Sequence, residues 1–237
     1  MGCCELQQYI FNELRAMPTN LLRSVPGNAT VVIVRNPRTF ERAVKRVIDL
    51  LGSAVLILLL SPLFLAVACL VLLFDGAPIV YRRRVIGPRG EFDAYKFRTM
   101  IRDADAVLAA DAELSRAFTH QFKLKSDPRV TRMGTWLRKC SLDELPQLLN
   151  VFKGQMSLVG PRMITSAELH KYLPYEELLL TVKPGITGYW QVGGRQEVSY
   201  TERVRMDVHY ITNWSLWLDL KILLRTPSRV IHARGAY

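Results

Sequence analysis

The chain has 237 residues, with 32 Lys and Arg against 21 Asp and Glu, which gives a formal net charge of +11. This length allows one sizeable core, and the 49% hydrophobic composition excludes a disordered or fibrous protein. The charge predicts anionic partners, such as nucleic acid, acidic lipid or phosphorylated metabolites, without choosing among them. The four cysteines, an adjacent N-terminal pair and the single residues Cys69 and Cys140, exclude a disulfide framework and zinc spacing. They favour a reducing compartment.

Residues 1–40 form an N-terminal extension to which the sequence assigns no role. Within it, residues 9–22 have an amphipathic pattern, and residues 30–34 (TVVIV) are typical of a strand. The sequence Pro26-Gly27-Asn28 predicts a turn between them.

Residues 50–74 contain no charged side chain. As a helix at about 1.5 Å per residue, this run would extend about 37 Å, which is enough to cross the hydrocarbon core of a bilayer. Ser61 and Pro62 lie almost at its centre, where proline removes a backbone hydrogen bond and bends a helix. Residues 41–80, the run with its flanks, are therefore predicted to contact a membrane.

Basic residues flank the apolar run on both sides. Arg42, Lys45 and Arg46 precede it, and residues 82–84 and Arg89 follow it. Because such clusters prefer the cytoplasmic side, both ends are predicted on the same face, as in a re-entrant hairpin made of helix, break and helix. Transmembrane helices also tolerate proline, so the residues alone leave a kinked transmembrane helix as the alternative.

The remaining residues, 81–237, are predicted to form a domain on the cytoplasmic face. Residues 75–140 hold 14 Lys and Arg against 8 Asp and Glu, which suits anionic head groups or phosphates. Residues 87–100 (GPRGEFDAYKFRTM) alternate apolar and polar side chains and predict a strand that carries Lys96 and Arg98. A helix is predicted over residues 101–122.

Two glycine-rich turns, at residues 183–188 and 193–195, precede helices predicted over residues 201–208 and 214–225. Trp214 and Trp217 are three residues apart and are predicted to share one helix face. There they would either anchor in a membrane interface or pack into the core. The expected fold is α+β and mainly helical, with a small β element and amphipathic helices at the membrane interface.

The sequence SLDELPQLLNVFKG places Asp143 and Glu144 directly before a short amphipathic helix. Apolar residues at helical spacing predict this helix, Pro146 suits its first turn, and Gly154 suits its end. The spacing of Ser141 and Glu144 is that of a capping box, which would explain the acidic pair by structure alone. The alternative is phosphoryl chemistry, in which one carboxylate attacks phosphorus while its neighbour helps to hold Mg²⁺ beside substrate phosphates.

Two arginines follow glycine-containing turns. Arg162 follows Gly160-Pro161, and Arg195 follows two glycines. A guanidinium binds phosphate oxygens through two parallel hydrogen bonds, so both arginines are candidate phosphate ligands.

Taken together, these motifs resemble the bacterial sugar transferase family, the monotopic polyprenyl-phosphate phosphoglycosyl transferases. The resemblance extends from about residue 42 to residue 226. It rests on the basic-flanked apolar run broken at Ser61-Pro62 and on YKFRTM (95–100), SDPRVTRMGTWLRKCSLDELPQLLNVFKGQMSLVGPR (126–162), VKPGITGYWQVGGR (182–195) and SLWLDLKILLRT (215–226).

The resemblance implies transfer of a sugar 1-phosphate from a UDP-sugar to undecaprenyl phosphate, with release of UMP, at the cytoplasmic face of the bacterial inner membrane. It implies that Asp143 is the nucleophile of a phosphosugar-aspartyl intermediate and that Asp143 and Glu144 hold Mg²⁺. The dipole of the following helix is expected to keep Asp143 ionised. The break at Ser61-Pro62 matches the family's re-entrant helix and favours the hairpin.

Further site residues follow from the same resemblance. Lys96, Arg98 and Arg162 match positions that line the phosphate site. Arg138 is expected to face the lipid phosphate, and Arg195 matches a block near the nucleotide.

The Trp-rich C-terminal block is similar to that of hexose-transferring relatives, which predicts glucose or galactose, with an N-acetylated sugar as the alternative. The product would begin an exopolysaccharide, capsule or O-antigen repeat unit. A non-catalytic adaptor on an anionic bilayer is the competing function, and a homodimer is left open. Nucleic-acid binding is disfavoured, because the apolar run interrupts the basic residues and the sequence contains no recognition module.

Overall fold

The computed structural model describes residues 22–25, 29–32, 39–121, 124, 127–193 and 198–231. The amphipathic pattern before residue 22, the predicted turn at residues 26–28 and Arg195 lie outside these residues. The described chain is mainly helical, with three two-stranded sheets. This content of helices and strands confirms the predicted α+β class.

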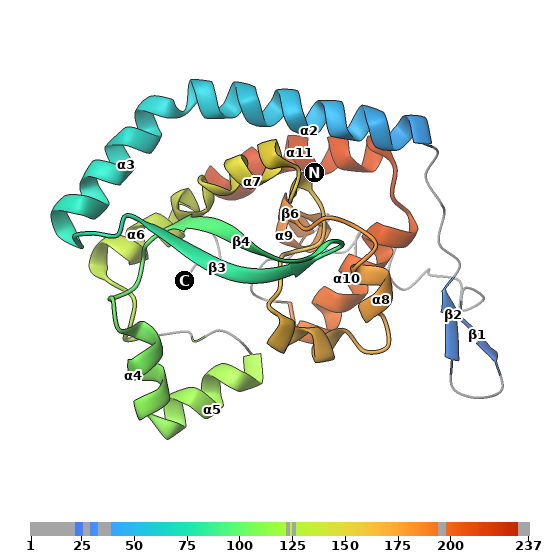
Figure 1. The fold of residues 1–237 in the computed structure, drawn as a ribbon. Helices are drawn as coiled ribbons and strands as arrows, with labels where there is room; N and C mark the ends of the chain where they lie inside the picture. Colours follow the sequence, from blue (N-terminus) through green and yellow to red (C-terminus); the bar gives the residue numbers. More distant parts are fainter. Residues whose placement is uncertain are drawn as a thin grey trace.

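A long bent pair of helices lies along one side of the molecule, above a β-hairpin and a group of shorter helices (Figure 1). The helices are α2 (Thr39–Leu59), α3 (Ser61–Phe74), α4 (Ala104–Ala110), α5 (Ala112–Gln121), α6 (Arg132–Lys139), α7 (Gln147–Lys153), α8 (Glu176–Leu179), α9 (Tyr189–Gly193), α10 (Tyr200–Thr212) and α11 (Leu216–Ile231), with the 3₁₀ turns η2 (Leu142–Glu144) and η3 (Ser166–Tyr172). The antiparallel pairs are β1 (Leu22–Val25) with β2 (Ala29–Val32) and β3 (Val80–Gly87) with β4 (Gly90–Phe97), and the parallel pair is β5 (Ser157–Val159) with β6 (Gly185–Thr187).

The strand predicted within residues 87–100 is confirmed as β4, and its antiparallel partner β3 was not predicted. The single helix predicted over residues 101–122 is wrong, because the chain forms two helices, α4 and α5, with Asp111 between them. The Asp111 carboxylate accepts hydrogen bonds from the backbone N–H groups of Glu113 and Leu114. Such an aspartate begins a new helix and ends the old one.

The helix break predicted at Ser61-Pro62 is confirmed. Helices α2 and α3 meet at Leu60 with a bend of 62°. The Ser61 hydroxyl donates to the carbonyl of Leu58 at 2.8 Å, which satisfies an acceptor left free next to proline. In the described chain no single helix has the length and hydropathy to cross a membrane, whereas the bent pair meets both criteria together.

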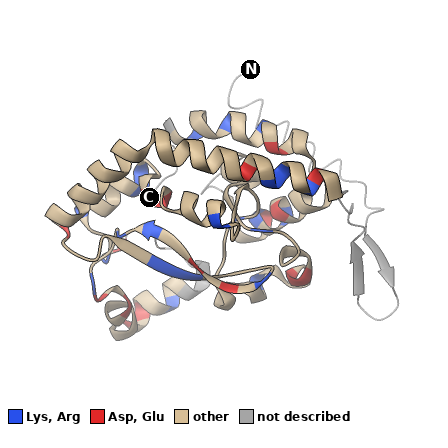
Figure 2. Cartoon of the chain, turned by 45° about the horizontal axis from the view of Figure 1, so that its top comes forward, with Lys and Arg blue, Asp and Glu red and all other residues tan. Residues whose placement is uncertain are grey.

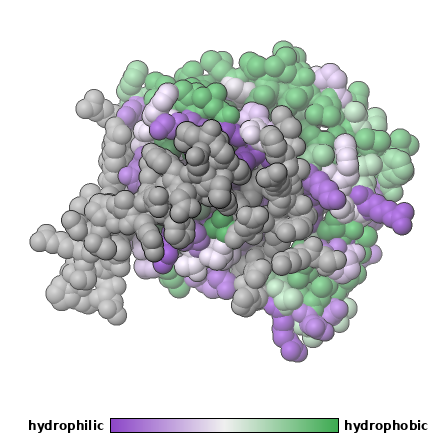
Figure 3. All heavy atoms as spheres, turned by 180° about the vertical axis from the view of Figure 1, so that it is seen from behind, coloured by the Kyte–Doolittle hydropathy of each residue, from purple (hydrophilic) through white to green (hydrophobic). Residues whose placement is uncertain are grey.

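The two ends of this bent pair differ in charge. Figure 2 shows the charged residues of α2 in its N-terminal half, whereas the rest of α2 and all of α3 contain none. The uncharged part exposes large apolar side chains, and Figure 3 shows hydrophobic atoms gathered where α2 and α3 lie. We call this the apolar surface; its exposed members are Leu51, Val55, Leu56, Leu58, Leu59, Leu65, Leu72, Leu73 and Phe74.

Charged residues of α2 attach it to the rest of the molecule. The Lys45 ammonium donates to the Asp219 carboxylate at 2.5 Å and to the carbonyl of Val159 at 3.0 Å. The Arg46 guanidinium donates to the last carbonyls of α7, those of Val151 and Phe152, each at 2.8 Å. These bonds join the N-terminal half of α2 to the end of α7, to the end of β5 and to α11.

Asp49, one turn further along α2, is buried against β5. Its carboxylate accepts the Ser157 hydroxyl at 3.0 Å and the backbone N–H of Leu158 at 2.9 Å. Asp49→Ala would leave both donors buried without a partner, so we expect the free energy of unfolding to fall by about 2 kcal/mol. Thermal unfolding of the purified protein in detergent would measure this loss. The matched control is Asp103→Ala, an exposed aspartate, and an equal midpoint for both variants would contradict the expectation.

The two tryptophans near α11 do not share a helix face, so that prediction is wrong. Trp214 precedes the first residue of α11 and is buried, and its indole N–H donates to Asp219 at 3.1 Å. Trp217 lies within α11 and is 62% exposed. Of the two, only Trp217 is available to an interface.

Candidate active site

Asp143 and Glu144 lie in the 3₁₀ turn η2, between α6 and α7. Ser141 has a φ of 56°, in the left-handed region, and its side chain caps no helix. The capping box predicted for Ser141 and Glu144 is therefore wrong. A left-handed residue other than glycine costs about 1–2 kcal/mol, and it turns the chain so that the acidic pair faces the interior rather than the end of a helix.

Lys96, near the end of β4, reaches both carboxylates. Its ammonium donates to the Glu144 carboxylate at 2.7 Å and lies 3.8 Å from that of Asp143. The Arg162 guanidinium lies 3.4 Å from the same oxygen of Glu144. The structure thus brings together Lys96, Asp143, Glu144 and Arg162, which the sequence predicted as one site from three separate segments.

Burial is the largest influence on both carboxyl groups, and it opposes ionisation. For Asp143, burial outweighs the attraction of Lys96, and repulsion from Glu144 adds to it, so the pKa of Asp143 is raised. For Glu144, Lys96 and Arg162 together outweigh burial and lower its pKa to about 2. Glu144 is therefore a fixed negative charge, whereas Asp143 is the carboxyl group of the pair that binds a proton more readily.

The sequence predicted an ionised Asp143 at the end of a helix, and the structure gives a different balance. The helix α7 begins only at Gln147, and the dipole effect falls off within the first turn. Burial consequently exceeds the effect of the dipole on Asp143.

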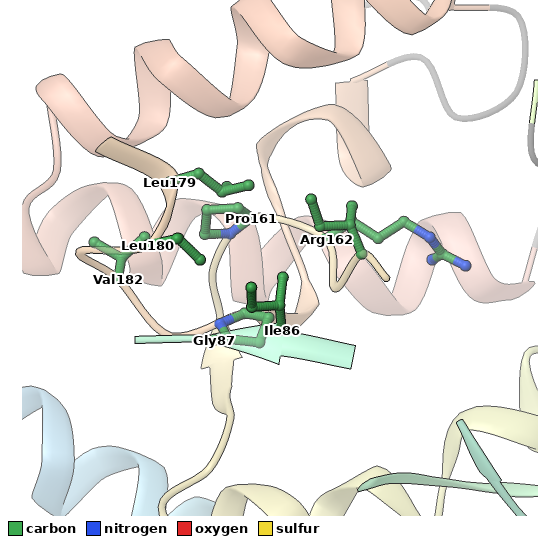
Figure 4. Close-up of a pocket in the computed structure, with 9 residues that line it drawn as sticks. Ile86, Gly87, Pro161, Arg162, Leu179, Leu180 and Val182 are labelled. Carbon is green, nitrogen blue, oxygen red and sulfur yellow. The ribbon is translucent and has the colours of Figure 1, made fainter. Parts of the chain in front are cut away.

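The turn before Arg162 requires glycine at position 160. A Cβ at Gly160 would lie 2.5 Å from the carbonyl oxygen of Lys183, so only glycine fits between β5 and the loop that leads to β6. Pro161 lines a small pocket together with Leu179 and Val182 (Figure 4). The Arg162 side chain points away from that pocket (Figure 4), and its guanidinium meets Glu144.

Arg98 and Arg138 have other partners. The buried Arg98 guanidinium donates to the carbonyls of Asp75, Gly76 and Ala77, so it anchors the chain at the end of α3. Arg138 donates to the Thr99 hydroxyl at 2.9 Å.

Burial lowers the pKa of Arg138, although the charge of Asp143 acts in the opposite direction. Arg138 therefore lies within electrostatic range of the acidic pair, whereas every hydrogen bond of Arg98 above goes to a backbone carbonyl.

A cavity of about 1260 Å³ connects these residues. Its charged part is lined by Lys96, Asp143, Glu144 and Arg162. Its apolar part reaches Leu56 on α2, Leu60 at the bend, and Leu223 and Val230 on α11. Ligand sites are commonly cavities of this order, with few polar groups on apolar walls. The cavity is large enough for a nucleotide sugar together with part of a lipid.

Trp190 on α9 and Arg203 on α10 are among the residues of the cavity wall that the sequence did not identify. Trp190 lies in the quoted block VKPGITGYWQVGGR, where only the glycines and Arg195 were considered. Arg203 falls within the helix predicted over residues 201–208, and the sequence assigned it no role. Only the packing of α9 against α10 shows that both line the cavity.

The acidic pair suits a metal that takes few protein ligands. In the described chain, no three His, Cys, Asp or Glu side chains cluster as a metal site. Mg²⁺, however, is commonly held by one or two carboxylates together with phosphate oxygens and water. The buried Asp143 and the half-buried Glu144, which both line the cavity, fit such a site, provided that the substrate supplies the remaining ligands.

The comparisons with known proteins agree on one family. The family model for the bacterial sugar transferase matches residues 40–233. The chain is 46% identical over 198 residues to the exopolysaccharide production protein ExoY of Sinorhizobium fredii, which covers 81% of this chain and 88% of that protein.

Two relatives named as phosphotransferases are longer than this chain. It is 45% identical over 202 residues to the undecaprenyl-phosphate galactose phosphotransferase of Salmonella typhimurium, covering 83% of this chain and 42% of that protein. It is 37% identical over 224 residues to the undecaprenyl-phosphate glucose phosphotransferase of Komagataeibacter xylinus, covering 90% of this chain and 40% of that protein. The chain thus spans less than half of each. Since the family model matches most of its length, the chain belongs to the bacterial sugar transferase family.

Proposed function

We propose that this protein transfers a sugar 1-phosphate from a UDP-sugar to undecaprenyl phosphate and releases UMP. The reaction would be the first membrane step in the synthesis of an exopolysaccharide, capsule or O-antigen. The observation that carries the proposal is the buried Asp143, which lies beside the ion-paired set of Lys96, Glu144 and Arg162. The names of the relatives support the two substrate classes.

In the first step an oxygen of the ionised Asp143 forms a bond to the sugar-bearing phosphorus, and the bond from that phosphorus to UMP breaks. UMP leaves with the electron pair of that bond. In the second step an oxygen of undecaprenyl phosphate attacks the same phosphorus, and the aspartyl carboxylate is regenerated. Lys96 and Arg162 supply positive charge where negative charge develops on the phosphoryl oxygens.

Asp143 and Glu144 would hold Mg²⁺, with substrate phosphates completing its coordination. When bound, this ion neutralises phosphate charge and makes UMP a better leaving group. Glu144 also keeps Lys96 and Arg162 in place through its two ion pairs. Arg138 is proposed to face the lipid phosphate. Arg98 is proposed to line the phosphate site, and Arg195 is proposed to lie near the nucleotide.

We propose that α2 and α3 enter the cytoplasmic leaflet as a re-entrant hairpin. The 62° bend, the absence of charge beyond Asp49 in both helices and the apolar surface support this placement. Further exposed apolar side chains, on helices proposed to lie at the interface, are Trp136, Leu149, Phe152, Trp217, Leu220 and Leu224. The apolar part of the cavity reaches Leu56 and Leu60 beside the bend, which would admit the polyprenyl chain while its phosphate meets the charged part.

The proposed sugar is glucose or galactose, which the names of two relatives support. UMP release by the purified protein, with undecaprenyl phosphate, Mg²⁺ and a panel of UDP-sugars, tests both the reaction and the sugar. Release that requires the lipid phosphate and one hexose is expected. Release with only an N-acetylated sugar would revise the donor. No release with any UDP-sugar, from folded protein in membranes, would favour a non-catalytic adaptor.

A further inference from the structure

Arg203 extends from α10 into the wall of the cavity and lies over two aromatic rings. Its guanidinium carbon is 4.3 Å from the centre of the Trp190 ring and 5.0 Å from that of Tyr200. A guanidinium that lies over a ring has its N–H groups in its own plane. These groups point outward and are free to bind an anion at the edge of the guanidinium. The aromatic rings therefore fix the orientation of Arg203 without using its hydrogen-bond donors.

The donors around Arg203 lack acceptors in the part of the chain that the structure describes. The Arg203 Nε, the Trp190 indole N–H and the Tyr200 hydroxyl are all buried without a hydrogen-bond partner. Trp190 itself is only 5% exposed. Buried donors are almost always satisfied, so three such groups around one ring pair indicate a ligand that accepts hydrogen bonds.

The charges nearby indicate that this ligand is an anion. The Arg162 guanidinium carbon is 5.8 Å from the centre of the same Trp190 ring, so two guanidinium groups contact one ring of the cavity wall. Glu144 pairs with Arg162, whereas no ion pair involves Arg203 among the described residues. Asp207, one turn along α10, is hydrogen-bonded by the Tyr172 hydroxyl at 2.8 Å.

Asp207 also neutralises the positive charge of Arg203 poorly. Burial raises the pKa of Asp207 to about 7, so a substantial fraction of this carboxyl group is protonated near neutral pH. Burial and the charge of Arg162 both lower the pKa of Arg203. The positive charge at Arg203 is thus left for a ligand to neutralise.

We infer that Arg203 and Trp190, with Tyr200, form a second phosphate-oxygen site of the cavity, next to the acidic pair and Arg162. The inference rests on the proposed function, because the phosphate would belong to one of its two substrates. Two sources have this chemistry: the diphosphate of the UDP-sugar and the phosphate of the polyprenyl acceptor. A phosphate between Arg162 and Arg203 would bind two guanidinium groups that a shared ring holds in position.

The test is steady-state kinetics of UMP release by the full chain in lipid nanodiscs, varying one substrate at a time. Arg203→Gln removes the charge, and Arg203→Lys keeps the charge without the planar fork. The control is Arg205→Gln, two residues along α10, where the arginine is exposed and pairs with Glu202 in an i,i+3 contact. A charge-assisted contact supports an expected rise in KM of about 10- to 100-fold for Arg203→Gln, with a smaller rise for Arg203→Lys.

A rise in KM for the UDP-sugar alone assigns the site to the donor diphosphate, and a rise for the lipid phosphate alone assigns it to the acceptor. Unchanged KM values for both substrates, or a fall in kcat alone, would overturn the inference. Protection of the wild-type protein by UMP against thermal unfolding, compared with Arg203→Lys, gives a readout without turnover. If the wild type shows no turnover with any donor, the proposed function fails. If UMP and inorganic phosphate then raise the unfolding temperature of the wild type and of Arg203→Lys equally, the phosphate site at Arg203 is rejected as well.

Discussion

Asp143→Asn is expected to lower the rate of UMP release by about 10³-fold or more, because the amide cannot act as the attacking oxygen. Asparagine has almost the same shape as aspartate. Among the described residues, no short hydrogen bond is donated to Asp143, and the nearest charged partner is Lys96, at 3.8 Å. The fold and the association with membranes should therefore be retained. Burst experiments with radiolabelled UDP-sugar should also show no covalent sugar phosphate on the variant.

The matched control for this variant is Asp93→Asn. Asp93 lies on β4 in the same part of the molecule, but its carboxylate is exposed and pairs only with the exposed Arg84 among the described residues. This control should keep nearly full activity. An undiminished rate of UMP release by Asp143→Asn would contradict the assignment of Asp143 as the nucleophile. An equal decrease of this rate in both variants would indicate a general loss of structure.

Lys96→Met is expected to lower activity near neutral pH by about 10²-fold, which is the typical effect of removing one group that stabilises developing charge. It should also change the pH dependence. Lys96 lowers the pKa of Asp143, so its removal raises that pKa further above the ordinary aspartate value. Because only the ionised Asp143 attacks, activity is lost as pH falls through its pKa, and the acid limb of kcat/KM should move to higher pH.

A pH profile of kcat/KM for the wild type and for Lys96→Met measures this change. The control is Lys153→Met, because Lys153 on α7 is exposed and donates only to the Tyr95 hydroxyl among the described contacts. An acid limb at the same pH in the wild type and in Lys96→Met would contradict the coupling of Lys96 to Asp143. Partial recovery of the Lys96→Met rate at higher pH would support it.

Local patterns in the sequence predicted the elements that depend on local interactions. Alternating side chains predicted β4, and apolar spacing predicted α7 with its end at Gly154, which has a φ of 79°. The bend at Ser61-Pro62 followed from the chemistry of proline. These features are set by residues within a few positions of one another, so a single sequence contains the information.

The predictions that failed depend on contacts between distant residues. A capping box for Glu144 is reasonable locally, but Lys96 and Arg162, distant in the sequence, bind its carboxylate instead. The contacts of Arg98 also depend on distant residues: it lies two residues after Lys96 and lines the same cavity, yet its guanidinium donates to carbonyls at the end of α3. Neither outcome follows from spacing along the chain.

The sequence likewise identified the acidic pair through a resemblance rather than through geometry. Nothing in the pattern around Asp143 distinguishes a nucleophile from a helix cap, and only the burial of Asp143 near Lys96 separates the two. Arg203 was missed because its aromatic partner Trp190 lies on a different helix.

The attachment of α2 through Lys45, Arg46 and Asp49 limits how this protein can be recombined with its relatives. Asp49 binds Ser157 and Leu158, only two residues before Gly160, so the hairpin and the phosphate-binding turn are built on one strand. A chimera that takes its hairpin from one relative and its catalytic part from another must therefore preserve both partners of these contacts. The helices α2 and α3 and the part of the chain that holds the acidic pair therefore form one structural unit rather than two exchangeable modules.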